Sequence, residues 1–324
     1  MFLALALIAV ATEAILGYPD TIYRRIGHPV SWIGGLIAWC DRAWNSAALS
    51  HEERRWRGIY VVVLLLAVGA LSGWAITAVL QYFLHGAIAL LLTGVVGSSL
   101  LAQRSLDAHV AAVASALETS GIDAGRRAVS MIVGRDTREL DEAAVSRAAI
   151  ESLAENFSDG VVAPLFWMAV AGLPGAICYK AINTADSMIG HRSERHLAFG
   201  WASARFDDLV NLPASRLSAF WFVFAAALSP GLSAPRAITV LFRDAGQHRS
   251  PNAGWPEAAM AGALDIQLSG PRIYDGVEVA ERWVGDGRNV LTPRDIRAAL
   301  DLYRAACGLQ IAALVALVVV SLMF

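Results

Sequence analysis

The amino-acid sequence predicts an all-α integral membrane protein, and three observations support this. Hydrophobic residues make up 56% of the 324 positions, charged residues make up only 17%, and the mean hydropathy is +0.50. Soluble domains are about 45–50% apolar and about 25% charged. Apolar stretches recur along the chain, and several approach the roughly 20 residues that a helix needs to cross a bilayer. We therefore expect one polytopic membrane domain over residues 1–324.

Four stretches predict complete membrane spans, at about 1–16, 59–80, 83–101 and 307–324. The first lacks both a basic start and a cleavage site, so it is expected to remain as a membrane helix and not to be removed as a signal peptide. The second and third are separated by a very short turn, which predicts a helical hairpin. Thr292 and Pro293 predict the start of the helix that runs into the last span, since proline is favoured at the first helical position.

Two further apolar stretches predict broken or re-entrant segments. Stretch 161–179 contains Pro164, Gly172, Pro174 and Gly175, and stretch 217–228 is too short to cross. Irregular backbone at membrane depth is tolerated where it lines a cavity buried in protein. If neither stretch crosses, the polar regions 102–160, 180–216 and 233–292 all lie on one side of the membrane.

The placement of arginines predicts which side that is. Region 17–58 is rich in arginine, whereas the turn after residue 80 has no Lys or Arg. The positive-inside rule then places the three polar regions in the cytoplasm, on a multi-pass protein of the cell (inner) membrane. Region 102–160 predicts three helices, the last capped by Asp136 or Thr137, and 274–283 predicts a short hairpin. The arginines of region 17–58 are Arg24, Arg25, Arg42, Arg54, Arg55 and Arg57.

The composition also excludes several classes of protein. A net charge of −2 and a pI near 6.4 are not those of a nucleic-acid-binding protein, which needs a basic face. The sequence has neither a P-loop nor a strand–GxGxxG–helix unit, so an ATP site would not be of those types. The three cysteines form no CxxC pair and are expected to be small buried residues, neither a disulfide frame nor a zinc site.

Acidic residues between 151 and 211 predict a metal site. Glu155 and Asp159 are four residues apart and share one face if the helix continues. Asp186 follows an asparagine by three residues, and Asp207 precedes another by four. Carboxylate and amide oxygens suit Mg²⁺. The competing interpretation of each pair is a solvated helix face or a helix cap, but the density of charge beside apolar segments, where unpaired charge is costly, favours function.

Basic residues in the same strings predict phosphate binding. All but one of the 26 Lys and Arg residues are arginine, and the exception is Lys180. A codon bias towards arginine explains the excess but not the retained lysine. Lys180, Arg192 and Arg195 are candidates to hold phosphate groups, so a magnesium site flanked by bases predicts a substrate that carries phosphate.

Three long strings resemble one protein family. They are GRDTRELDEAAVSRAAIESLAENFSDGVVAPLFW, GLPGAICYKAINTADSMIGHRSERHLAFGWASARFDDLVNLPASRL and HRSPNAGWPEAAMAGAL. They resemble the adenosylcobinamide-phosphate synthase family of cobalamin biosynthesis (CobD/CbiB), and the likeness covers roughly residues 15–290. Near the start, Gly17-Tyr18-Pro19-Asp20 replaces the usual Leu-Gly-Asp-Pro pattern, and the turn His28-Pro29-Val30 is retained.

The resemblance implies an ATP- and Mg²⁺-dependent amide-forming ligase in the lipid bilayer. It would join a carboxylate of the corrinoid adenosylcobyric acid to 1-aminopropan-2-ol or to its O-phosphate, through an acyl phosphate. Assembly as a homo-oligomer, or with other membrane enzymes of cobalamin synthesis, is left open. The alternatives are a non-enzymatic membrane signalling or sensor protein of related architecture and a small-molecule transporter, whose polar residues should lie within the spans.

For this chemistry we assign roles to particular residues. The metal ligands are Glu155, Asp159, Asp186 and Asp207, and the phosphate-binding residues are Lys180, Arg192 and Arg195. His191 or Glu194 is the base for the amine proton, and Lys180 is also placed in the catalytic group. The expected substrate-binding residues are Asn183, Asn211, His248, Asn252 and Tyr274.

Overall fold

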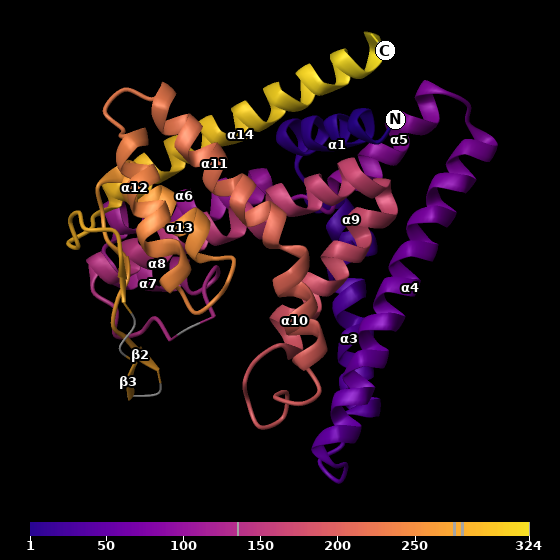
Figure 1. Cartoon of the computed structure of the whole chain (residues 1–324), viewed down its shortest axis with the longest axis horizontal. Helices are drawn as coiled ribbons and strands as arrows, with labels where there is room; N and C mark the ends of the chain where they lie inside the picture. The colour runs from indigo at the N-terminus through magenta and orange to yellow at the C-terminus, as the bar shows by residue number, and fades with distance from the viewer. Residues whose placement is uncertain (135, 275–276, 280–281, 324) are drawn as a thin grey trace. The chain divides into compact units, whose positions relative to one another are not determined.

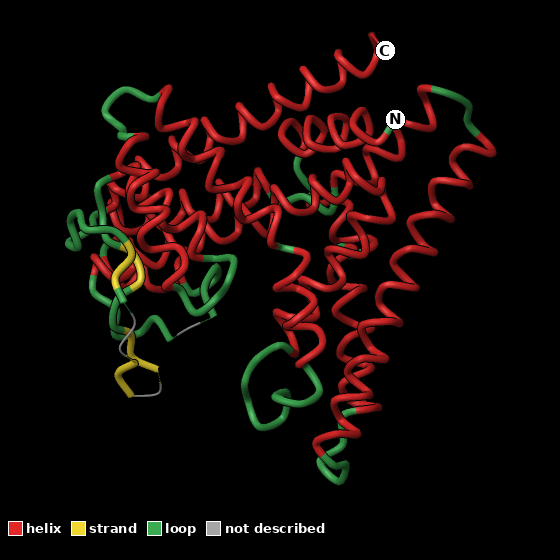
Figure 2. The backbone as a smooth tube through the Cα atoms, viewed as in Figure 1, coloured by secondary structure: helices red, strands yellow, loops and turns green. Residues whose placement is uncertain are grey.

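The protein is almost entirely helical in a computed structural model that describes residues 1–134, 136–274, 277–279 and 282–323 (Figures 1 and 2). The chain forms two compact units. Unit 1 comprises Met1–Ala102, Ala163–Asn211 and Leu314–Phe324, and unit 2 comprises Gln103–Val162 and Leu212–Ala313. The expectation of a single polytopic domain stays a prediction.

Unit 1 is a helical bundle built around one long helix. Its helices are α1 (Phe2–Leu16), α2 (Asp20–Ile26), α3 (Pro29–Trp44), α4 (His51–Phe83), α5 (Ala87–Ser98), α9 (Ala163–Ile189) and α10 (Trp201–Val210). The long helix α4 starts with a capping box, in which Ser50 and Glu53 bond each other's backbone N–H groups. Its apolar face packs on α9, as the core cluster of Val61, Leu65 and Ala185 shows.

Glycines allow α4 and α9 to approach closely. A Cβ atom at Gly73 would lie 2.6 Å from Cα of Pro174, and one at Gly69 would lie 3.3 Å from Cα of Cys178. Small residues four apart are typical of helix contacts in membranes, where backbones pack directly against each other. The pair Gly69 and Gly73 therefore fixes the α4–α9 contact, and a larger residue at position 73 would force the helices apart.

Unit 2 is also mostly helical, with two small antiparallel sheets. Its elements are α6 (Gln103–Ser120), α7 (Ile122–Val129), α8 (Glu142–Phe157), the π turn η1 (Ser158–Val162), α11 (Leu212–Leu228), α12 (Ala234–Asp244), the 3₁₀ turn η2 (Ala245–Gln247), α13 (Gly254–Leu264), β1 (Leu268–Ser269), β2 (Arg272–Tyr274), β3 (Val277–Val279), β4 (Trp283–Val284) and the first part of α14 (Pro293–Met323). Strand β1 pairs with β4, and β2 pairs with β3. Phe157 stands at the centre of an aromatic core, 4.7 Å from Phe222 and 5.4 Å from Tyr303 between ring centroids.

The helical loops largely follow the sequence expectation. Region 102–160 holds the three predicted helices α6, α7 and α8, and α14 begins at the predicted Pro293. The predicted cap of α8 is wrong, because Asp141, and neither Asp136 nor Thr137, accepts the hydrogen bond from the N–H of Ala144 at 2.7 Å. None of the three cysteines, all of which lie in the described part of the chain, forms a disulfide.

The all-α membrane fold class is confirmed by helix length and composition. Among the described residues, four helical stretches are long and apolar enough to cross a bilayer, and two bent pairs pass the same test together. The four stretches are His51–Phe83, Ala87–Ser120, Glu142–Ile189 and Pro293–Met323. The bent pairs are Phe2–Leu16 with Thr21–Trp44, at 104°, and Trp201–Val210 with Leu212–Leu228, at 45°.

Two stretches differ from their predicted type. The predicted complete span 1–16 belongs to a bent pair, because Gly17 (φ 62°) ends α1 after 15 residues, or about 22 Å, short of the roughly 30 Å hydrocarbon core. The predicted broken segment 161–179 lies inside the stretch Glu142–Ile189. Its backbone does break, at Ala171 (φ −129°) and Gly172 (φ 67°).

Candidate functional site

Four predicted site residues meet in unit 1, where the last turns of α9 pack on α10. Asn183 and Asp186 lie one turn apart on α9. Asp207 stands one turn before Asn211, the C-cap residue that follows α10. The Asp207 carboxylate accepts a hydrogen bond from Nδ2 of Asn211 at 2.9 Å and another from Nδ2 of Asn183 at 3.4 Å. The structure therefore brings together, in space, residues that are 28 positions apart at most.

Asn211 is bonded on both sides of its amide. Its Nδ2 donates to Asp207, and its Oδ1 accepts from the hydroxyl of Tyr179 at 2.9 Å. Only 1% of Asn211 is exposed. These contacts favour a role in which Tyr179 and Asn211 hold Asp207 in position, while contact of Asn211 with a substrate stays a prediction.

Asp186 is the exceptional carboxylate of this cluster. It is partly buried and close enough to Asp207 for the two carboxylates to repel each other, with a further contribution from Asp208. Within the described part of the chain, the Asp186 carboxylate has no hydrogen bond and no ion pair. A Cβ atom at Gly190 would collide with Oδ1 of Asp186, so glycine leaves this carboxylate its space. Unpaired buried charge is costly, and a bound cation would relieve the repulsion.

The donor set fits a magnesium ion that keeps water and substrate oxygens. No group of three or more His, Cys, Asp and Glu side chains is placed to hold a metal among the residues that the structure describes. Mg²⁺ is commonly bound through one or two carboxylates together with substrate phosphates. Asp186 and Asp207 supply such a pair. Both of the other predicted ligands, Glu155 at the end of α8 and Asp159 in η1, lie in unit 2, and all four metal assignments stay predictions.

Lys180 lies one turn before Asn183 on α9 and acts electrostatically on His28. His28 caps α3, because its Nδ1 accepts a hydrogen bond from the N–H of Val30 at 3.2 Å, and its ring packs edge-on against Tyr18. An imidazole that accepts at Nδ1 carries its proton on Nε2. His28 was not among the expected site residues, although the His-Pro pair does predict a helix start. The sequence does not reveal that Lys180 lies near His28.

The loop between α9 and α10 adds two exposed side chains to this cluster. His191 acts electrostatically on Asp186, and Arg192 acts on Asp208. His191 and Arg192 are therefore close to the carboxylates of this cluster, which agrees with their predicted roles in proton transfer and phosphate binding. Those roles themselves stay predictions.

The next residues of the loop have structural partners. Arg195 forms an ion pair with Asp41 at 2.7 Å, and its carbonyl accepts from Nδ2 of Asn45 at 3.0 Å. Glu194 is exposed. His196 lies 3.4 Å from Asp41, and burial lowers the pKa of His196 against the opposing effect of that carboxylate. Phosphate binding by Arg195 would have to compete with its ion pair.

The predicted substrate residues of region 233–292 lie in unit 2. Asn252 accepts hydrogen bonds at Oδ1 from Ser215 at 3.0 Å and from Arg216 at 2.9 Å, and Arg216 stacks on Trp255. Tyr274 lies in β2, and its side chain is outside the described part of the structure. Substrate binding by Asn252 and Tyr274 stays a prediction.

His248 stands beside the buried acid Glu257, which Ser269 links to a second buried acid, Glu151. Its Nδ1 accepts from the N–H of Ser250 at 3.0 Å, and its Nε2 lies 3.9 Å from Glu257. Ser269, which has the unusual φ of 57°, donates its hydroxyl to Glu257 at 3.1 Å and its N–H to Glu151 at 2.7 Å. Glu151 is thus buried and bonded, while Glu155, one turn later, is exposed.

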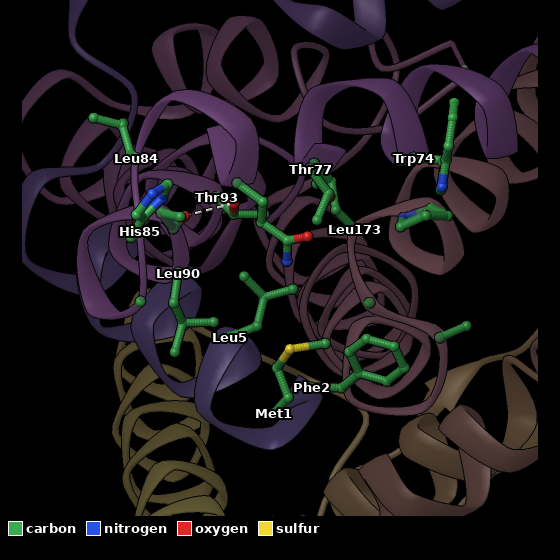
Figure 3. Close-up of a pocket in the computed structure, with 16 residues that line it drawn as sticks. Met1, Phe2, Leu5, Trp74, Thr77, Leu84, His85, Leu90, Thr93 and Leu173 are labelled. Atoms are coloured by element: carbon green, nitrogen blue, oxygen red, sulfur yellow. Dashed lines mark hydrogen bonds between the residues drawn. The ribbon is translucent and has the colours of Figure 1, made fainter. Parts of the chain in front are cut away.

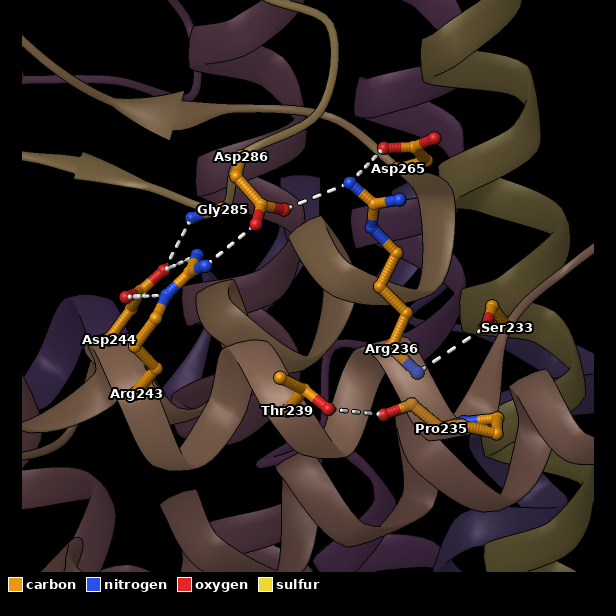
Figure 4. Close-up of polar contacts among 9 residues, drawn as sticks. All are labelled: Ser233, Pro235, Arg236, Thr239, Arg243, Asp244, Asp265, Gly285 and Asp286. Atoms are coloured by element: carbon orange, nitrogen blue, oxygen red, sulfur yellow. Dashed lines mark hydrogen bonds and ion pairs between the residues drawn. The ribbon is translucent and has the colours of Figure 1, made fainter.

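A network of alternating charges joins α12 to the turn after β4 (Figure 4). Arg243 contacts Asp244 and Asp286, both at 2.7 Å, and Arg236 contacts Asp286 at 2.9 Å. Hydrogen bonds from Arg243 and Arg236 lower the pKa of Asp286. Asp244 also accepts from the N–H of Gly285 at 2.8 Å, so every carboxylate of this network is paired.

Comparison with known proteins assigns the chain to a family. The model of the CobD/CbiB protein family matches residues 6–303. The chain belongs to the CobD/CbiB family. Three similar relatives are each named cobalamin biosynthesis protein CobD. The protein from a Sinorhizobium species is 52% identical over 309 residues, covering 95% of this chain and 94% of the relative.

The other two relatives are equally complete matches. The protein of Rhizobium meliloti (strain 1021) is 50% identical and covers 99% of this chain and 98% of its own length. That of a strain of Rhodobacter capsulatus is 49% identical and covers 94% of each chain. No solved structure matches this CobD/CbiB chain. The protein is therefore a multi-helix membrane protein of a cobalamin biosynthesis family.

Proposed function

We propose that this protein catalyses the ATP-dependent formation of an amide between a carboxylate of adenosylcobyric acid and 1-aminopropan-2-ol or its O-phosphate. The observation that carries the proposal is the family match over residues 6–303, together with a cluster of carboxylates and bases within the matched region. The family match also favours a role in the pathway over the signalling alternative.

The reaction needs activation of the carboxylate, because a carboxylate does not condense with an amine at neutral pH. Transfer of the γ-phosphoryl group of ATP to the carboxylate gives an acyl phosphate and ADP. The amine then attacks the acyl carbon, phosphate leaves, and the amine proton passes to a base. A bound Mg²⁺ would screen the charge of the phosphate groups during this transfer.

The unit 1 cluster contains suitable groups for these steps. Asp186 and Asp207 would hold Mg²⁺, and Tyr179 and Asn211 would keep Asp207 in place. Lys180 and Arg192 would bind phosphate oxygens. His191, which is exposed beside Asp186, is better placed than Glu194 to accept the amine proton.

We further propose that His248, Asn252 and Tyr274 of unit 2 bind the corrinoid or the amine donor. We also place the protein in the inner membrane, with the active site on the cytoplasmic side, where ATP is available. The arginines of region 17–58 support this orientation by the positive-inside rule.

The activity is tested by reconstitution of the purified protein in detergent with adenosylcobyric acid, ATP and Mg²⁺. Each amine donor is supplied separately, and the product is identified by mass. We expect an amide product that depends on ATP, with release of ADP and phosphate. Absence of product with both donors would contradict the proposal, and the faster donor identifies the physiological amine class.

The orientation is tested by thiol labelling of intact cells after replacement of the three native cysteines. Ser193 is exposed in the loop after α9 and is a suitable position for a single cysteine. Ser193→Cys should react with an impermeant reagent only after the membrane is opened. Labelling of intact cells would place the loop outside and overturn the shared cytoplasmic site.

A further inference from the structure

Unit 1 contains a cavity of about 500 Å³ away from the polar cluster (Figure 3). Its walls come from the start of α1, the last turns of α4, the first turns of α5 and the break in α9. Leu5, Thr93 and Leu173 form a buried floor, whereas Trp74 at the rim is 66% exposed. The space is therefore a pocket with a closed end and an open side.

The lining of this cavity is nearly free of polar groups. None of the sixteen lining residues, all of which the structure describes, is Asp, Glu, Lys or Arg. The hydroxyls of Thr77 and Thr93 donate to carbonyls of their own helices, at 2.8 and 2.7 Å. Gln81 and His85 remain as polar side chains without a hydrogen bond in the described part of the chain. A cavity of this chemistry excludes water and accepts an apolar ligand.

The position along α4 places the opening near a membrane surface. The cavity borders the last three turns of this helix, opposite the end that carries Arg54, Arg55 and Arg57. Trp74, Tyr82 and Phe83 are strongly exposed at the cavity end. Exposed aromatic residues at the end of a span mark the interface between lipid headgroups and chains. The cavity thus opens where an acyl chain joins its headgroup.

We propose that this cavity binds one acyl chain of a membrane lipid with a zwitterionic headgroup, of the phosphatidylethanolamine class. The chain occupies the apolar floor, and Gln81 and His85 bond the ester and headgroup oxygens at the mouth. No lining side chain is Lys or Arg, so the α-amino group of Met1 is the one basic group at the pocket besides the imidazole of His85, and it contributes no more than about 1 kcal/mol of attraction to an anionic headgroup. This site is independent of the proposed reaction, and its test does not involve turnover.

The proposal is tested by native mass spectrometry of the full chain, titrated in detergent with phosphatidylethanolamine or phosphatidylglycerol. Ala89→Phe fills the floor of the cavity, and Ala87→Phe is the matched control, because Ala87 is exposed on the same helix and is not part of the lining. We expect one tightly bound phosphatidylethanolamine per chain, about tenfold weaker binding in Ala89→Phe, and unchanged binding in Ala87→Phe. Equal binding by all three proteins would overturn the proposal.

A second pair of variants keeps the test decisive if Ala89→Phe does not fold. Gln81→Leu and His85→Leu alter only exposed side chains at the mouth. They should retain binding of a lipid but lose the preference for phosphatidylethanolamine over phosphatidylglycerol. A wild-type protein that prefers phosphatidylglycerol, or variants that discriminate as the wild type does, would overturn the assignment of the headgroup.

Discussion

The carboxylates of the two units have opposite electrostatic surroundings. In unit 2, Asp244 and Asp286 are bound by Arg243 and Arg236 within 2.9 Å. In unit 1, the Asp186 carboxylate lies beside Asp207 and forms no ion pair within the described chain, with only the electrostatic effect of the exposed His191 opposing the repulsion. Paired charges join a helix to a turn and complete the fold. Two carboxylates that repel each other destabilise it, which indicates that they are kept for a ligand.

The largest effect should come from removing charge at the predicted magnesium ligands. Asp186→Asn and Asp207→Asn keep the shape of each side chain. We expect turnover to fall about 100-fold or more, with partial recovery at high Mg²⁺, because a lost carboxylate weakens the ion's binding. Turnover is measured across a range of Mg²⁺ concentrations. An unchanged Mg²⁺ dependence in both variants would place the metal elsewhere.

A smaller but clear effect is expected at the single lysine. Lys180→Arg keeps the positive charge but replaces a compact ammonium with a planar guanidinium that needs different geometry. Turnover should fall about tenfold, while the unfolding temperature stays that of the wild type. Normal turnover of Lys180→Arg would show that the reaction does not need a lysine at this position, and codon use would then explain it.

Two variants of His28 separate its capping role from any role at the site. His28→Leu removes the acceptor that caps α3 and should cost about 1 kcal/mol of unfolding free energy, whereas His28→Ser retains a capping oxygen. If Nε2–H of His28 also serves the site beside Lys180, turnover falls in both variants. Full activity of His28→Ser would restrict His28 to the cap. Denaturant unfolding and turnover are measured on each variant.

The smallest effect is expected in the paired network of unit 2. Asp286→Asn should lower the free energy of unfolding by no more than about 1 kcal/mol, because this ion pair is exposed. Arg243 and Arg236 hold the folded-state pKa of Asp286 below its ordinary value of 3.8, so the contribution is present above pH 3.8 and is lost as the pH falls through the folded pKa. The difference between wild type and variant should disappear in acid, and a constant difference would contradict the ion-pair origin.

Composition and spacing are enough to predict the membrane fold and the pairs of polar residues within α9 and at the end of α10. Asn183 and Asp186 were predicted to share a helical face because three residues is almost one turn, and the same reasoning holds for Asp207 and Asn211. The break at Gly172 was predicted from prolines and glycines. These predictions depend on residue spacing within one helix, and helix geometry directly sets the relative positions of such side chains.

Contacts between distant segments could not be predicted in this way. Glu151, Glu155 and Asp159 have the spacing of one helical face, but the π turn after Phe157 and the N–H of Ser269 give them different surroundings. The ion pair of Arg195 with Asp41 joins residues 154 positions apart. Sequence periodicity does not predict such a partner. Arg195 was therefore interpreted as a residue available to bind phosphate.

The Asp186 carboxylate is expected to be kept at a cost to stability, and thermal unfolding of Asp186→Asn beside Asp286→Asn measures this cost. Both variants are purified in the same detergent without Mg²⁺ or nucleotide. We expect the two variants to shift the unfolding temperature in opposite directions. Asp186→Asn should unfold at a higher temperature than the wild type, because repulsion with Asp207 is relieved, and Asp286→Asn should unfold at a lower temperature. A lower unfolding temperature in both variants would show that Asp186 is a structural charge like Asp286, and that its carboxylate is not kept for a ligand.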